Sequence, residues 1–192
     1  MKLSSSQKKG FTVVELLITI SVFLVLSVAV VGNYRTTTRG LALNSLANLV
    51  AADIRRAQSY GISSVATGNS FVAHGISFDK NFDNAYMLFA DTGVANLQNG
   101  NLGATCSGEC IERMKIQTGI TITAICVDKK SGPCKNMDSV HIAFKRPNPE
   151  PSIIGIKGAT KAYSDAEITF TTSDGLLSKT IVIWRTGLIS IE

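Results

Sequence analysis

The sequence lacks the residue patterns that most catalytic sites require. It contains no proline before Pro133 and only two histidines, His74 and His141. It has no Ser, His and Asp in the setting of a nucleophile elbow, and no Gly-rich phosphate loop. The two histidines stand apart in strand-like stretches, so we expect exposed or hydrogen-bonded strand residues rather than ligands or bases. The chain is therefore predicted to be no enzyme and to need no cofactor.

A strong charge imbalance is also missing beyond the first ten residues. Three of the 19 Lys and Arg precede Phe11, and the others exceed the 14 Asp and Glu by only two. The basic residues that could share one face are Arg55, Arg56, Lys129, Lys130, Lys135, Lys145, Arg146, Lys157 and Lys161. Ordinary solvated surface is the favoured interpretation, so DNA is a partner that the sequence allows but does not favour.

One long apolar run, Phe11 to Val31, is present near the start of the chain. At 1.5 Å per residue it would be about 31 Å long, close to the ~30 Å hydrocarbon thickness of a bilayer. Lys8 and Lys9 precede it and are expected to stay in the cytoplasm, which places the rest of the chain across the membrane. A secretory signal has a shorter apolar core and a small-residue cleavage site, which is not evident here. A plain anchor explains the length but not Glu15.

Glu15 needs a partner because a carboxylate inside a membrane-spanning helix costs a few kcal/mol. Cleavage between Gly10 and Phe11 would give Phe11 an α-amino group, one helical turn before Glu15. The carboxylate can pair with that ammonium group in its own chain or in a neighbouring chain, and pairing offsets the cost of burial. These residues favour a helix that is cleaved before Phe11 and whose Glu15 pairs with a new α-amino group.

The stretch "KKG" followed by "FTVVELLITISVFLVL" resembles the N-terminal signature of type IV pilins and type II secretion pseudopilins. This resemblance covers about residues 8–31. It implies that prepilin peptidase cleaves after Gly10 and methylates the amine of Phe11, and that Glu15 helps a subunit dock on the growing filament. The implied partners are other pilin or pseudopilin subunits, the peptidase, the inner-membrane assembly platform and, before assembly, membrane lipid.

The helix is predicted to continue beyond the apolar run with an amphipathic half that packs on a sheet. From Leu41 onward, apolar residues recur with a spacing near 3.6, at Leu46, Leu49, Val50, Ile54 and Ala57. Gly61 is expected to end the helix, and Gly32-Asn33 to be a weak point inside it. The pattern then changes to short strands, predicted at 70–78, 85–90, 112–117, 120–127, 139–146, 152–157, 166–172, 179–185 and 188–192.

The expected fold is α+β, a pilin-like fold in which the long N-terminal helix packs on a C-terminal antiparallel β-sheet domain. The predicted segments are a cleaved leader (1–10), a transmembrane and filament-core half-helix (11–31), an amphipathic half-helix (32–61) and a β-rich domain (62–192). "LANLVAADIRRAQSYGISS", "LFADTG", a strand with a proline turn in "HIAFKRPNPEPS" and a closing hairpin in "TIVIWRTGLISIE" resemble the GspH/FimT group of minor pilins and pseudopilins.

The four cysteines, Cys106, Cys110, Cys126 and Cys134, are an even number in one short region. Zinc would favour pairs spaced C-x2–4-C, and the second spacing is too wide. Disulfides fit a domain outside the cytoplasm better. The sequence allows three pairings; we favour Cys106–Cys110 and Cys126–Cys134, since each closes a small loop, and cross-linking of the two loops is the alternative.

A calcium loop is suggested by Asp79, Asn81 and Asp83, but the pattern fails at two positions. Asn84 replaces the required Gly, and Ala90 replaces the final Glu. A turn between two strands is the stronger interpretation, so no metal site is predicted.

The predicted function is that of a structural subunit of a type IV pilus or a type II secretion pseudopilus, with a minor or tip position favoured by the group resemblance. The alternative is a minor pilin that binds a ligand or DNA, in adhesion or competence. The expected location is the bacterial inner membrane, as a single-pass protein, and then a surface pilus or a periplasmic pseudopilus.

Overall fold

The computed structural model describes residues 10–63, 66–67, 70–92, 106, 108–129 and 132–192. The chain divides into two compact units, Met1–Arg39 and Gly40–Glu192, and one helix, α1 (Val13–Ile62), contributes to both. The predicted long helix is therefore confirmed. It is unbroken at Gly32 and Asn33, where the sequence suggests a weak point.

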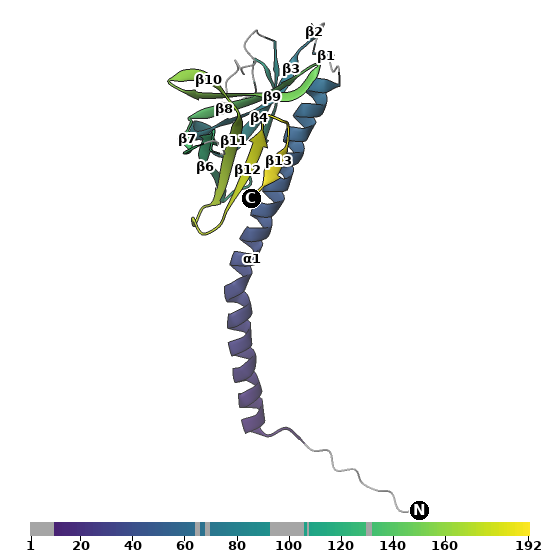
Figure 1. The fold of residues 1–192 in the computed structure, drawn as a ribbon. Helices are drawn as coiled ribbons and strands as arrows, with labels where there is room; N and C mark the ends of the chain where they lie inside the picture. Colours follow the sequence, from purple (N-terminus) through teal and green to yellow (C-terminus); the bar gives the residue numbers. More distant parts are fainter. Residues whose placement is uncertain (1–9, 64–65, 68–69, 93–105, 107, 130–131) are drawn as a thin grey trace, which may run out of the picture. The chain divides into compact units, whose positions relative to one another are not determined.

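The strands of the Gly40–Glu192 unit form antiparallel sheets, as predicted for the fold class. The larger sheet has the order β10-β9-β8-β3-β4-β5 and the smaller sheet the order β13-β12-β11-β6-β7, with β1 and β2 paired separately (Figure 1). The bounds of these elements are β1 Ala66–Thr67, β2 Ser70–Phe71, β3 Ala73–Asp79, 3-10 helix η1 Lys80–Phe82, β4 Ala85–Asp91, β5 Cys110–Lys115, β6 Ile120–Val127, β7 Lys135–Asn136, β8 Ser139–Lys145, β9 Asn148–Lys157, β10 Ala159–Tyr163, β11 Asp165–Thr172, β12 Ser178–Trp184 and β13 Ile189–Ile191.

One hydrophobic core fills the space between the second half of α1 and the inner faces of both sheets. The apolar spacing of the helix puts Leu46, Val50, Ile54 and Ala57 on the buried side, as predicted. Leu49, which the sequence assigns to the same stripe, is 54% exposed. It lies one position beside Val50, and one position turns a side chain by about 100° around a helix.

A hydrogen bond joins the helix to the larger sheet inside this core. The hydroxyl of Tyr86, which is fully buried on β4, donates to Asp53 Oδ2 on α1 at 2.6 Å. Burial, together with the Asp53 carboxylate, raises the pKa of Tyr86 above its usual range. The hydroxyl therefore stays protonated and remains a donor.

Gly61 lies near the helix end, as predicted, but the structure gives another reason for glycine at this position. A Cβ at Gly61 would lie 2.3 Å from the carbonyl oxygen of Phe144 on β8. The helix runs one residue further, to Ile62, so Gly61 permits a close approach of α1 to the sheet rather than acting as the residue that ends the helix.

Each predicted strand overlaps an observed one, but three short or exposed strands, β1, β7 and β10, are missed. The proline turn expected in residues 141–152 forms at Arg146 and Pro147, between β8 and β9, whereas Pro149 and Pro151 lie within β9. The pairing of β9 with β8 shifts between Ala143 and Lys145, opposite the two prolines. Proline, which has no N–H to donate, is tolerated at such an irregularity.

The final hairpin forms as predicted. Trp184 donates its N–H to the carbonyl of Leu188, and the N–H of Gly187 donates to the carbonyl of Trp184. Gly187 has a φ of 83°, a left-handed conformation that glycine adopts without strain. The hairpin places β13 at one edge of the smaller sheet.

Candidate functional site

The candidate site begins just before the helix, at Gly10, Phe11 and Thr12. These three residues are exposed and lie outside α1, which starts at Val13. A Cβ added at Gly10 would meet no atom within 4 Å, so no packing in this chain requires glycine there. The Gly10–Phe11 peptide bond is thus accessible in non-helical backbone, the form in which a peptidase can bind it.

Thr12 caps the helix. Its side-chain Oγ1 accepts a hydrogen bond from the N–H of Glu15 at 3.3 Å, and its carbonyl accepts one from Leu16 at 3.2 Å. Thr-x-x-Glu is the sequence pattern of a capping box, in which the fourth residue also favours a helix start. This second role of Glu15 was not predicted, although the Thr-x-x-Glu pattern is visible in the sequence.

Glu15 is the only ionisable residue in Val13–Val30. The hydroxyls of Thr19, Ser21 and Ser27 are satisfied, because each donates to a carbonyl three or four residues earlier, at 2.8–2.9 Å. No described residue forms a hydrogen bond or ion pair with the Glu15 carboxylate. This carboxylate is therefore the one strongly polar group of the segment that the described helix does not compensate.

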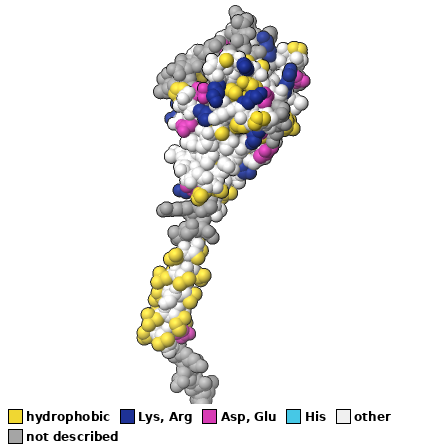
Figure 2. All heavy atoms as spheres, turned by 60° about the vertical axis from the view of Figure 1, so that its left-hand side comes forward, with side chains coloured by type: hydrophobic (Ala, Val, Ile, Leu, Met, Phe, Trp, Pro, Cys, Tyr) yellow, Lys and Arg dark blue, Asp and Glu magenta, His cyan; other side chains and the backbone are white. Residues whose placement is uncertain are grey.

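The segment around Glu15 is apolar and uncovered. Val13–Val30 has a mean hydropathy of 2.7, none of its residues is buried within the structure, and Phe11 and Phe23 are 81% and 70% exposed. Figure 2 shows hydrophobic side chains along this part of the helix. By length and composition it can cross a membrane.

The N-terminal sequence also has a counterpart among known protein families. Residues 5–31 match the family model described as the prokaryotic N-terminal methylation motif. The motif supports a type IV pilin-like precursor. It implies processing by prepilin peptidase, assembly with other pilin subunits and a structural role rather than an enzymatic one. No curated protein and no solved structure matches the chain.

Within this pilin-like chain, the structure brings the three central candidates together. Gly10, Phe11 and Glu15 occupy the exposed start of α1 and the residues just before it. Lys8 and Lys9, expected to be the leader's positive charges, lie outside the described residues. Together, a motif, an accessible peptide bond and an apolar helix fit a single-pass, membrane-anchored protein.

The cysteines form two pairs, Cys106–Cys110 and Cys126–Cys134, with Cα–Cα distances of 5.4 and 5.3 Å. This is the sequence-local pairing predicted from the spacing. Cys126 is on β6, and Cys134 directly precedes β7, the strand that pairs with β6, so the bond joins two neighbouring segments. The described residues contain no cluster of three or more His, Cys, Asp and Glu side chains suited to a metal ion.

The other candidates have structural roles. Asp79 caps η1 by accepting a hydrogen bond from the N–H of Asn81 at 2.7 Å, so the calcium-like stretch is a turn. His74 contacts the carbonyl of Val72 at 3.2 Å and is buried. His141 is also buried, and its Nδ1 has no hydrogen-bond partner, so the expected exposure or hydrogen bond is wrong for this residue.

The basic residues do not stand alone as a positive face. Arg56 pairs with Glu112 at 2.9 Å, Lys129 with Glu167 at 2.7 Å, and Lys135 with Asp128 at 2.8 Å. Hydrogen bonds from Arg56 to Tyr60 and Glu112 raise the pKa of Arg56 further. Carboxylates thus neutralise part of the basic set, as in an ordinary solvated surface.

Proposed function

We propose that this chain is a minor, tip-proximal subunit of a type IV pilus or a type II secretion pseudopilus, related to the GspH/FimT group. The observation that carries the proposal is the accessible Gly10–Phe11 bond, followed by an uncovered apolar helix with one carboxylate. An apolar surface of this size is not left in water by soluble proteins, so it is covered by lipid first and by other subunits later.

Processing prepares the chain for assembly. Prepilin peptidase removes residues 1–10 and methylates the new amine of Phe11. Before cleavage, the chain crosses the inner membrane once, with the basic leader in the cytoplasm and the β domain outside. The two disulfides support this location, because disulfides persist in oxidising compartments.

Glu15 then pairs with the Phe11 amine of its own chain or of a neighbour. The pair satisfies both charges once the segment is buried among other subunits and away from water. In the precursor, the same carboxylate lies near the helix N-terminus, where the helix dipole favours a negative charge. After processing and docking on the assembly platform, the charged Phe11 amine would replace the helix dipole as the partner of the Glu15 carboxylate.

The decisive experiment is N-terminal mass spectrometry of the chain recovered from filaments. We expect Met1–Gly10 to be absent and Phe11 to carry one methyl group. The variant Gly10→Val should accumulate as unprocessed precursor, while its β domain stays folded because position 10 contacts nothing. Assembled filaments that retain residues 1–10 would rule the proposal out.

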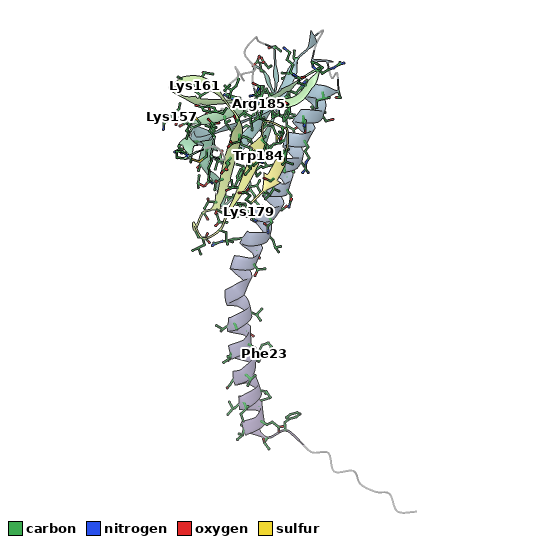
Figure 3. The ribbon with its side chains drawn as sticks, in the orientation of Figure 1. Phe23, Lys157, Lys161, Lys179, Trp184 and Arg185 are labelled. Carbon is green, nitrogen blue, oxygen red and sulfur yellow. A yellow bond between two sulfur atoms is a disulfide. The ribbon has the colours of Figure 1, made fainter. Side chains whose placement is uncertain are left out.

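The second candidate function, a DNA-binding minor pilin, receives little support from the described surface. Lys157 and Lys161 lie on the β9-β10 hairpin (Figure 3), but Arg185 faces the carboxylate of Glu150 at 3.9 Å. A DNA-binding surface would show steeply salt-dependent affinity, which a gel-shift series across salt concentrations would reveal. We therefore keep the structural subunit as the conclusion.

A further inference from the structure

A polar cavity of about 360 Å³ lies in the β domain, between the edge of the larger sheet and one end of the smaller sheet. The larger sheet contributes the start of β9 and the end of β10. The other wall comes from Asp128, which follows β6, and Arg185, which follows β12. Its volume falls in the range of about 300–1,000 Å³ that is usual for small-molecule sites.

The aromatic wall of this cavity, Tyr163, is held in place by its neighbours. A Cβ on Gly155, on the adjacent strand β9, would lie 2.8 Å from the ring atom Cε2 of Tyr163. Glycine at position 155 therefore allows the ring to lie against the strand. On the side of Lys135, the ammonium Nζ lies 5.8 Å from the ring centroid. The ring is thus positioned before any ligand arrives.

Asp128 lines the cavity in an uncommon backbone conformation that hydrogen bonds support. Its φ is 53°, and it is the one non-glycine residue with positive φ in the described part of the chain. Its carboxylate accepts hydrogen bonds from Lys135 Nζ at 2.8 Å and from the N–H of Ser164 at 3.0 Å. Strained residues that the surroundings hold so firmly concentrate at functional sites.

Glu150 and Arg185 face each other at the cavity, with Glu150 Oε2 and Arg185 Nε 3.9 Å apart. Their side chains are 59% and 69% exposed, so the contact is loose and solvated. A guanidinium has five donors and a carboxylate two acceptor oxygens. The pair can therefore offer donors and acceptors side by side to a third group.

Positive and negative side chains balance around the cavity, and this balance restricts the net charge of a ligand that could bind there. Asp128 is neutralised by Lys135, and Glu150 lies opposite Arg185. The carboxylates would repel an anion, and Arg185 would repel a metal ion. Asn148, Ser152 and Ser164 add neutral groups that both donate and accept. The lining suits a ligand without net charge that carries several hydroxyl groups.

We propose that this cavity binds a neutral carbohydrate, with sugar hydroxyls bound by Glu150 and Arg185, beside the edge of Tyr163. The proposal goes beyond the subunit role and does not depend on it, since all the residues involved belong to the Gly40–Glu192 unit. A pilin-like subunit with such a site would contribute glycan recognition to its filament.

The test is saturation-transfer NMR on the full chain in detergent micelles. The probes are neutral hexoses, N-acetylhexosamines and their disaccharides, with glucuronic acid as an anionic probe and free amino acids as zwitterionic probes. We expect saturation of the neutral sugars. Absence of any sugar signal, or a preference for the anionic or zwitterionic probes, would overturn the proposal.

Variants locate the binding. Glu150→Gln and Arg185→Ala should each weaken sugar affinity about tenfold or more, as expected when a charge-assisted hydrogen bond is lost. Lys179→Ala is the matched control, since it removes a positive charge near the start of β12, the strand that Arg185 follows, away from Arg185 (Figure 3), and should leave affinity unchanged. Equal affinity in all three variants would place the sugar elsewhere and refute the site.

Discussion

At the scale of the residue, Glu15 serves two physical roles that the structure allows us to separate. Its backbone N–H is bonded to Thr12, which stabilises the first turn of α1. Its carboxylate has no described hydrogen-bond or ion-pair partner, although it is the only ionisable group in the apolar segment. The capping hydrogen bond acts within one chain. The charge is proposed to pair with a Phe11 amine, in the same chain or in a neighbouring chain. Substitutions that keep one role and remove the other can therefore distinguish them.

We predict that Glu15→Ala and Glu15→Gln both insert in the membrane but fail to enter filaments. Glutamine is favoured at the same capping-box position, so it keeps the helix start while removing the charge. Both changes make the span less costly to insert. Filament incorporation can be measured by immunoblotting of sheared fibres beside total membranes. Normal incorporation of Glu15→Gln would show that capping, and not pairing with the Phe11 amine, is the essential role.

His141 is a buried group whose protonation should oppose folding. Burial lowers the pKa of His141 to about 4 from its usual value near 6.5. Between these two pH values the unfolded chain binds a proton that the folded chain does not, so stability falls as the pH falls from about 6.5 to about 4. Burial lowers the pKa of His74 as well, which adds to the same trend.

We predict that His141→Phe reduces this loss of stability on acidification by a few kcal/mol at most. The aromatic ring keeps the contact with Phe89, whose ring centroid is 6.2 Å away. Unfolding in urea can be followed by fluorescence of Trp184, the single tryptophan, in detergent micelles at a series of pH values. Carboxylates titrate equally in the unmodified chain and in His141→Phe, so their contribution cancels. If the free energy of unfolding depended on pH equally in both proteins, the prediction would be contradicted.

At the scale of the element, the attachment of α1 to the sheets depends on a few named contacts. The apolar stripe of the helix supplies most of the buried surface. The Tyr86–Asp53 hydrogen bond adds a directional contact, and the Arg56–Glu112 pair lies at the exposed margin. Exposed ion pairs contribute little, whereas a buried acceptor that loses its donor is costly.

Tyr86→Phe should lower the free energy of unfolding by about 1–3 kcal/mol, because Asp53 loses its hydroxyl donor in a partly buried position. Arg56→Ala, the matched change at the exposed margin, should cost less than about 1 kcal/mol. Both values can be obtained from urea unfolding monitored at Trp184. A combined Tyr86→Phe and Asp53→Ala variant should be less destabilised than the sum of the single changes. Strict additivity would mean that the bond contributes nothing.

Sequence periodicity predicted the elements that bury an apolar face, and missed those that do not. Strand β10 is exposed along most of its length and lacks alternation, so only its pairing with β9 around Gly158 defines it. The proline turn was predicted and forms at Arg146 and Pro147, but Pro149 and Pro151 continue into β9, where the irregular pairing accommodates their missing N–H groups. Pairing with the neighbouring strand therefore decides what the periodicity of one segment leaves open.

At the scale of the whole molecule, the two candidate sites differ in how far the sequence reveals them. Gly10, Phe11 and Glu15 are neighbours in the chain, so their spacing alone suggests the peptidase and the filament. The cavity residues Asp128, Glu150, Tyr163 and Arg185 come from four separate segments, and no local pattern connects them. Only the closing of the two sheets on one core brings them together.

The division of the chain into two compact units leads to a prediction about solubility. A truncated chain that begins at Arg35 keeps the whole Gly40–Glu192 unit, including the buried stripe of α1 and both sheets. It loses Phe11 to Val31, whose described side chains are almost all exposed and apolar. Soluble monomers rarely expose contiguous apolar patches above a few hundred Å². We therefore expect the burial of this segment to be the main driving force for membrane insertion and for the proposed filament assembly.

We expect the truncated chain to be soluble and monomeric without detergent, and the chain that begins at Phe11 to require detergent or to form filaments. Light scattering after size-exclusion chromatography measures the mass of each species. Circular dichroism should show the β domain equally folded in both, which excludes unfolding as the cause of any aggregation. If the truncated chain aggregated while the longer chain stayed monomeric in water, residues 11–31 would have to be a core helix of a globular protein. The pilin-like architecture, and with it the proposed role of Glu15, would then be wrong.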